Sequence, residues 1–278
     1  MKTRLNKIPC FLNFIDKIRI LLVIVKEILY NRFMEINSIQ NAKVKTWMKY
    51  HQKKYRDLDG KYLIEGEHLI EEALQAKVVS CLLIRKGQTL MFDFLGSIYY
   101  LDDSIIDKLS KNVSQVNYMA VCEKKECKIK EKQRLLLLDA IQDPGNMGTI
   151  IRSAYSFGFD AIYLGKDCVD IYNEKVIRST QGALFYLPLV TCDILSMIKE
   201  LQKEQVEVIV TALSDESYDL SELQPKGAIA IVMGNEGCGV KQAIIDQADV
   251  LVKIEMTNFE SLNVAIAASI CMYELRKG

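Results

Sequence analysis

A polar turn separates a hydrophobic segment from an amphipathic one in the stretch 135–158. The hydrophobic part reads LLLLDAIQ, and DPGN follows before a helical pattern begins. We expect Asn146 to cap this helix, because its short side chain can accept hydrogen bonds from the first free N–H groups. Arg152 lies off the apolar stripe, where a guanidinium can pair with phosphate or reach a ribose hydroxyl. Taken singly, a helix cap and a solvent-facing charge would also explain these two residues.

Two later turns carry comparable chemistry. GNEGCG, residues 234–239, follows a hydrophobic strand pattern, and its three glycines let backbone amides approach a ligand closely. Its spacing differs from the GxGxxG dinucleotide fingerprint, and a tight structural turn is the alternative reading. In the third turn, Ser261 and Asn263 place short hydrogen-bonding side chains beside the start of a helix, with Ser261 as its expected cap.

Alternating strand and helix patterns after residue 134 must position these turns. The strands are expected at 135–138, 161–164, 187–190, 206–211, 228–233 and 249–254. The helices are expected near 146–157, 171–178, 193–203, 240–246 and 261–275. The first helix should face the sheet through residues at helical spacing, namely Met147, Ile150, Ile151 and Ala154. This order predicts a parallel sheet covered on both faces, with ligands beyond the carboxyl ends of its strands.

Residues 34–122 read as a smaller α/β unit. A basic helical stretch begins near Ser38 or Asn41, KYLIEG reads as a strand, and a helix follows with Leu69, Ala73 and Leu74 inward. The segments VVSCLLIRK, SIYYLDD and 117–122 read as further strands, and Asp102 or Asp103 as a helix cap. The almost wholly charged segment 123–134 is interpreted as a solvated linker between two folding units.

Residues 1–33 form an apolar but charge-interrupted extension. Asp16, Lys17, Arg19 and Lys26 break the run, so it falls short of the ~20 apolar residues of a membrane span. No secretory cleavage pattern follows it. We interpret the extension as an amphipathic helix and expect no stable membrane association.

The formal net charge of zero hides an asymmetry. Residues 1–60 contain thirteen Lys/Arg against five Asp/Glu, whereas residues 135–278 contain eleven against twenty. A basic front end indicates either a polyanion partner or a solvated helix face. The candidate phosphate contacts are Lys43, Lys45, Lys49, Lys53, Lys54 and Arg56. The eight cysteines form no CxxC pair and only two histidines are present, so no metal site is expected and reduced thiols in a cytoplasmic setting are indicated.

The motifs together resemble a known family. DPGNMGTIIRSA, RSTQGALFYLP, MGNEGCGV and ESLNVAIAASI follow one another in the order found in the SpoU (TrmH-type) RNA 2′-O-ribose methyltransferases of the SPOUT superfamily. The likeness covers essentially all of 135–278. YLIEGEHLIEEAL resembles the small RNA-binding domain that often precedes the catalytic domain in this family.

The resemblance implies a domain division and an activity. Residues 34–122 would be the α/β RNA substrate-binding domain, and 135–278 a parallel-sheet methyltransferase domain with a C-terminal trefoil knot, an exception to the rule against knots. The family works as a homodimer and transfers a methyl group from S-adenosylmethionine to a ribose 2′-hydroxyl. The N-terminal domain favours ribosomal RNA as the substrate.

Carried over by motif, the resemblance also names site residues. Gly234, Ile254, Met256 and Leu262 would bind the cofactor. The polar positions of the active site would be Asn146, Arg152, Glu236, Ser261 and Asn263. Arginine is a poor base, so we expect Arg152 to stabilise the developing alkoxide or to hold the adjacent phosphate. One departure stands at Glu255, where the family usually has proline.

Three alternatives remain open at this point. A transfer-RNA methyltransferase of the same family would carry the same motifs. A catalytically silent RNA-binding paralogue would have no need of the polar residues just named. A Rossmann-type nucleotide enzyme would need an early glycine fingerprint, which the sequence lacks.

Overall fold

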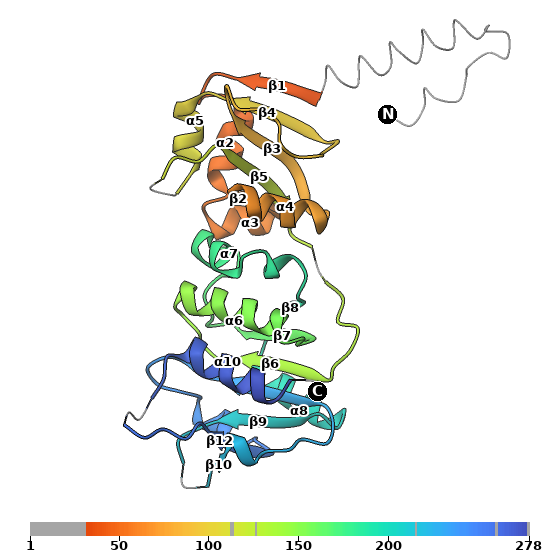
Figure 1. Cartoon of the computed structure of the whole chain (residues 1–278), viewed down its shortest axis with the longest axis vertical. Helices are drawn as coiled ribbons and strands as arrows, with labels where there is room; N and C mark the ends of the chain where they lie inside the picture. Colours follow the sequence, from red (N-terminus) through yellow and green to blue (C-terminus); the bar gives the residue numbers. More distant parts are fainter. Residues whose placement is uncertain (1–31, 112–113, 126, 215, 259–260, 277–278) are drawn as a thin grey trace, which may run out of the picture.

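Two β-sheets and their covering helices stand one above the other along the long axis of the molecule (Figure 1). The structure, a computed structural model, describes residues 32–276 except 112–113, 126, 215 and 259–260. The expected helical extension therefore lies almost entirely outside the described residues.

The N-terminal sheet is mixed and has the strand order β1-β4-β3-β5-β2. Its strands are β1 (Phe33–Ile36), β2 (Lys61–Glu65), β3 (Val79–Arg85), β4 (Ser97–Leu101) and β5 (Tyr118–Glu123). Its helices are α2 (Ala42–Lys49), α3 (Lys53–Asp59), α4 (Glu67–Gln75) and α5 (Asp103–Leu109). Strand β5 runs antiparallel to both of its neighbours, β2 and β3.

The C-terminal sheet pairs its seven strands in parallel, in the order β10-β12-β9-β11-β6-β7-β8. The strands are β6 (Arg134–Leu138), β7 (Ala161–Gly165), β8 (Leu189–Cys192), β9 (Glu207–Thr211), β10 (Tyr218–Asp219), β11 (Ile229–Met233) and β12 (Val250–Lys253). The α-helices are α6 (Pro144–Ser156), α7 (Glu174–Thr180), α8 (Ile194–Lys203), α9 (Gln242–Ile245) and α10 (Val264–Glu274). Short 3₁₀ turns, η1 (Ala183–Phe185) and η2 (Leu220–Glu222), complete the unit.

Strand β6 shows how this sheet divides its side chains between two cores. In β6, Leu136 and Leu138 join the core under α6 and α10, whereas Leu135 and Leu137 join the core under α8 and α9. This is the two-residue alternation of a strand covered on both faces. The expected parallel sheet is confirmed, and so is the buried stripe of α6, whose four named residues are fully buried.

Some elements begin or end at other residues than expected, because capping residues and glycines set their ends. The basic stretch forms two helices, α2 and α3, and Asn41 caps α2 by accepting a hydrogen bond from the Lys43 N–H at 2.9 Å. Helix α3 ends at Gly60, whose φ of +61° suits glycine. Strands β1 and β10 have four and two residues, too few to show a clear alternation in the sequence.

The N-terminal and C-terminal units bury side chains in a common hydrophobic cluster. Tyr62, Ile64 and Leu69 of the N-terminal unit lie in one hydrophobic cluster with Ile177 and Phe185 of the C-terminal unit. The described residues of 124–133 form no helix or strand. The N-terminal unit is therefore packed directly against the C-terminal one, in addition to being connected by the charged segment.

Candidate active site

The turn after β6 begins helix α6 two residues earlier than expected. Asp143 is the cap: its Oδ1 accepts a hydrogen bond from the Asn146 N–H at 2.8 Å, and Pro144 occupies the first helical position. Proline suits that position because the first N–H groups of a helix have no partner there. The prediction of Asn146 as the cap is therefore wrong. As a result, the Asn146 side-chain amide is available for other contacts.

That amide joins residues from all three predicted turns. Asn146 Nδ2 donates to Glu236 Oε1 at 3.1 Å, and Asn263 Nδ2 donates to Asn146 Oδ1 at 2.9 Å. Glu236 also accepts hydrogen bonds from the backbone N–H groups of Asp143 at 3.2 Å and Gln142 at 3.4 Å. Three side chains predicted from separate motifs thus form one hydrogen-bond network.

The network favours the ionised form of Glu236. Partial burial raises the pKa of its carboxyl, but the hydrogen bonds from Asn146 and from backbone N–H groups outweigh this, and the pKa lies below the usual 4.5. A lowered pKa contributes stability in full above the usual value, and this contribution is lost as the pH falls through the folded-state value.

A Glu236→Gln variant should lose about tenfold in kcat, because hydrogen bonds to a charged acceptor are replaced by weaker and partly mismatched ones. The difference in melting temperature between wild type and variant should stay constant from about pH 8 to pH 6 and shrink toward pH 4. Thermal unfolding at several pH values and single-turnover rates would measure this. A difference that grew on acidification would contradict it.

The glycine-rich turn is folded around Asn235. The backbone of Asn235 pairs with that of Gly239 in both directions, at 2.9 and 3.0 Å. Its side-chain Oδ1 accepts hydrogen bonds from the N–H groups of Gly237 and Cys238, while Nδ2 donates to the Ala140 carbonyl at 2.8 Å. Asn235 thus ties the glycine turn to the end of β6. Sequence reasoning missed it, although an asparagine between glycines is a known signal for a side-chain-closed turn.

A second tie between the same two turns runs through Lys241. Its ammonium lies 3.0 Å from Asp139 Oδ1 and 3.1 Å from Asp167 Oδ2, and these two carboxylates raise the pKa of Lys241. Asp139 is buried at the end of β6. This pair also escaped the sequence analysis, because nothing in the sequence indicates that residues 102 positions apart meet.

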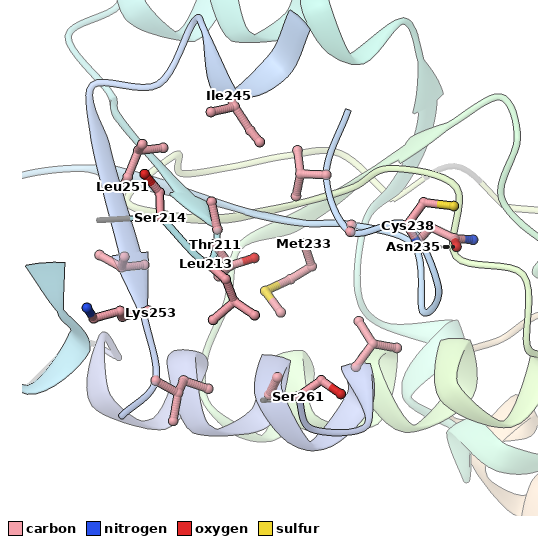
Figure 2. A pocket seen from close by; sticks show the side chains of 18 of the residues that line it. Thr211, Leu213, Ser214, Met233, Asn235, Cys238, Ile245, Leu251, Lys253 and Ser261 are labelled. Atoms are coloured by element: carbon pink, nitrogen blue, oxygen red, sulfur yellow. Dashed lines mark hydrogen bonds between the residues drawn. The ribbon is translucent and has the colours of Figure 1, made fainter. Parts of the chain in front are cut away.

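A cavity of about 1250 Å³ opens beside the network. All four predicted cofactor residues, Gly234, Ile254, Met256 and Leu262, line it, together with Glu236 and Ser261. Figure 2 shows Asn235 and Cys238 at one end, Ser214 and Leu251 at the other, and Met233 between them. The cavity therefore joins the glycine turn, the end of β12 and the start of α10.

Helix α10 begins at Val264, later than expected. Asn263 is its cap, accepting hydrogen bonds from the N–H groups of Ala265 at 2.9 Å and Ile266 at 3.3 Å. The prediction of Ser261 as the cap is wrong, since the chain reaches helical geometry only after Asn263. Ser269 donates to Ser153 Oγ at 2.9 Å, which links α10 to α6.

Arg152 lies six residues after Asn146 on α6 and is exposed. Among the described residues its guanidinium has no hydrogen bond or ion pair to another side chain. The structure therefore leaves it outside the three-residue network, with its charge open to solvent.

The expected phosphate contacts divide into two groups. Lys43, Lys45, Lys49, Lys53 and Lys54 are exposed on α2 and α3. Arg56 is 5% exposed; it donates to the Tyr50 carbonyl at 2.7 Å and pairs with Asp170. The prediction that Arg56 contacts phosphate is therefore wrong, because burial and an internal carboxylate occupy its guanidinium.

The described residues contain no cluster of three or more His, Cys, Asp or Glu placed to hold a metal ion. Seven cysteines in the described part of the chain are free thiols. No helix among the described residues is long and apolar enough to cross a membrane.

Comparison with known proteins gives two family matches. Residues 133–273 match the SpoU rRNA Methylase family, and residues 41–120 match the MRM3-like substrate binding domain. The 23S rRNA (guanosine(2553)-2'-O)-methyltransferase RlmP of Bacillus subtilis (strain 168) is 38% identical over 246 residues, covering 87% of this chain and 99% of that protein.

The fold is also similar to those of solved RNA methyltransferase structures. The crystal structure of an rRNA methyltransferase from Sinorhizobium meliloti has a TM-score of 0.78 at 25% identity, covering 88% of this chain and 97% of that one. A crystal structure of an RNA 2'-O ribose methyltransferase has a TM-score of 0.75 at 26% identity, covering 87% of this chain and 98% of that one.

Proposed function

The chain belongs to the SpoU rRNA methylase family, and we propose that it methylates a ribose 2′-hydroxyl of ribosomal RNA with S-adenosylmethionine as the methyl donor. The observation that carries this proposal is the hydrogen-bond network of Asn146, Glu236 and Asn263, in which Glu236 also lines the cavity. The name of the relative from Bacillus subtilis, a 23S rRNA 2′-O-methyltransferase, supports both the reaction and the substrate class.

The cavity fits a ligand of the size and character of S-adenosylmethionine. At about 1250 Å³ it is large enough for a nucleoside with an amino-acid tail. Ile254, Met256 and Leu262 offer apolar side chains for the adenosine, and Gly234 brings its backbone to the wall. When bound, the cofactor supplies an electrophilic methyl group on a sulfonium.

The residues of the chain position and activate the acceptor. A ribose 2′-hydroxyl is weakly acidic, so its negative charge must be stabilised as it attacks. Arg152 is the residue for that task, because its guanidinium is charged, exposed and unpaired among the described residues. Asn146, Glu236, Ser261 and Asn263 hold the acceptor and the cofactor edge in register, so that the two reactants meet in line.

The exposed lysines of α2 and α3 are the proposed RNA contacts. Lys43, Lys45, Lys49, Lys53 and Lys54 form a basic surface on a unit whose sequence matches a substrate binding domain. The methyltransferase unit is acidic and would grip a polyanion poorly. Residues 34–122 are therefore proposed as the RNA-docking domain, 123–134 as the linker and 135–278 as the methyltransferase domain.

Two further family features are proposed for the C-terminal domain. A C-terminal trefoil knot is proposed from the family to which the chain belongs, with the glycine turn and the start of α10 lining one cavity. A homodimer formed through α10 would cover Ile266 and Tyr273, which are 54% and 50% exposed. A ribosomal RNA substrate and free thiols fit a cytoplasmic location.

The experiment is transfer of labelled methyl from S-adenosylmethionine to unmodified 23S ribosomal RNA and, in parallel, to transfer RNA. Digestion should yield 2′-O-methyl nucleosides from the ribosomal RNA, and mapping should include the guanosine equivalent to the one named for the Bacillus subtilis relative. Label only in transfer RNA would instead assign the chain the transfer-RNA methyltransferase activity of the same family. Cofactor binding with no label in either RNA would favour a silent RNA-binding protein.

A further inference from the structure

The docking unit (residues 34–122) and the methyltransferase unit (residues 135–278) are held together by specific contacts, which we call the joint. The sequence predicts two units separated by a solvated linker, but the structure packs them through one shared hydrophobic cluster. Two polar contacts flank this cluster, and each leads from the docking unit to the helix that carries Arg152.

The first contact is the buried ion pair between Arg56 and Asp170. The two side chains are 6% and 17% exposed, and the partners lie 114 residues apart in the sequence. Asp170 also accepts a hydrogen bond from the Tyr172 N–H at 3.0 Å. The Tyr172 ring packs against Tyr62 of β2, with 4.7 Å between ring centroids, and Lys124 lies 4.4 Å from the Tyr172 centroid.

Helix α7 follows this contact and presses directly on α6. A Cβ added at Gly148 of α6 would lie 2.3 Å from Ser179 Cβ and 2.9 Å from the Val176 carbonyl. Only a glycine permits so close an approach. Gly148 lies two residues after Asn146 and four before Arg152, so α7 packs against the catalytic part of α6.

The second contact runs through Tyr186. Its hydroxyl donates to Glu72 of α4, lying 2.9 Å from Oε2 and 3.2 Å from the carbonyl oxygen. Burial and the Glu72 carboxylate raise the pKa of Tyr186 to about 12. The Tyr186 ring stacks on Tyr155, with centroids 5.4 Å apart and planes 14° from parallel. Tyr155 stands one turn after Arg152 on the same helix.

From these contacts we infer that Arg56, Asp170, Glu72 and Tyr186 are positioning residues that hold the RNA-docking domain at a fixed distance and angle from the methyl-transfer site. The two routes converge on α6, one through Gly148 and one through Tyr155. A docking surface fixed to the catalytic helix selects a nucleotide by its distance from the docked RNA, in addition to any recognition of its base. This inference rests on the proposed function.

The test compares joint variants with wild type on two substrates. Asp170→Asn removes the charge that pairs with Arg56, and Tyr186→Phe removes only the hydroxyl that binds Glu72. Asp170→Glu keeps the carboxylate and serves as the conservative variant. Glu204→Gln is the matched control, because it breaks an ion pair with Lys132 on the surface, away from the joint. The substrates are full-length unmodified 23S ribosomal RNA and a short stem-loop that carries the methylated nucleotide.

We expect Asp170→Asn to raise KM for full-length RNA by at least about tenfold and to spread methylation to neighbouring nucleotides. Tyr186→Phe should also raise KM and spread methylation, but to a smaller extent. Asp170→Glu should have a KM and a methylation position closer to those of wild type than Asp170→Asn has. Rates on the stem-loop and the dissociation constant of S-adenosylmethionine should match those of wild type. Glu204→Gln should behave as wild type on both substrates.

The outcomes test the inference and the proposed function separately. Wild type that methylates no RNA would overturn the proposed function. Wild type that methylates one nucleotide, with joint variants that keep its position and KM, would overturn the inference. If Asp170→Asn fails to fold, Tyr186→Phe alone decides the question, because the loss of one hydroxyl leaves the ring stack in place.

Discussion

An Arg152→Ala variant is expected to lose methyl transfer by a factor of about 100 or more in kcat, or roughly 3 kcal/mol of transition-state stabilisation. The side chain is exposed and has no partner among the described residues, so its removal breaks no internal contact. The loss should therefore fall on the chemistry and on RNA contact, while the melting temperature and the affinity for S-adenosylmethionine stay close to those of wild type. Single-turnover methylation of ribosomal RNA, calorimetric cofactor binding and thermal unfolding would measure the three quantities.

Two further variants sharpen this result. Arg152→Lys keeps the positive charge without the planar fork and should retain part of the activity. Lys199→Ala removes an exposed cation from α8, which packs on the other face of the sheet, and should leave activity unchanged. Equal rates for wild type and Arg152→Ala would remove Arg152 from the mechanism.

Local patterns predicted well the helix and strands that carry the candidate active site. The apolar stripe of α6 and the hydrophobic runs of β6 and β11 have the periods of a buried helix and of buried strands, and all three elements formed within two residues of their expected bounds. Such periods depend on neighbours in the chain, so a sequence displays them directly. The proximity of the three polar turns could then be predicted, because a parallel sheet brings the carboxyl ends of its strands to one edge.

Helix caps were harder to predict, since several nearby residues can compete for one position. Asp143 and Asn146 can both accept hydrogen bonds from free N–H groups, and Pro144 decides between them by favouring the first helical position. At α10 the same competition ends with Asn263 as the cap instead of Ser261. In both cases the shifted boundary decides which side chain does not act as the cap: Asn146 donates to Glu236 instead, and Ser261 lines the cavity.

Long-range partners could not be predicted from local pattern at all. Glu236 and Asn146 lie 90 residues apart, and Arg56 lies 114 residues from Asp170. Motif resemblance placed the first pair in one site, whereas no motif covers the second. Arg56 therefore looked like one more cation of a basic helix, and only its burial reveals a role in joining the two units.

The glycine turn provides the other large effect. In Gly234→Ala, the new Cβ would lie 2.2 Å from both the Gly239 carbonyl carbon and the Val240 nitrogen, and 2.4 Å from the Gly239 oxygen. All three are backbone atoms, so no side-chain rotation can relieve the contact and the two strands of the turn must separate. Because Gly234 lines the cavity, we expect cofactor affinity to fall by about 100-fold and the melting temperature to fall as well.

The matched control is Gly227→Ala, just before β11. Gly227 has no atom within 4 Å of an added Cβ and its backbone is not left-handed, so alanine should fit there without strain. Calorimetric titration with S-adenosylmethionine and thermal unfolding of both variants would make the comparison. Normal cofactor affinity in Gly234→Ala would mean that the turn can open without disturbing the ligand, and the cofactor would then have to bind away from this wall of the cavity. Loss of affinity in Gly234→Ala alone would instead tie cofactor binding to the tight closure of the glycine turn between Gly234 and Val240.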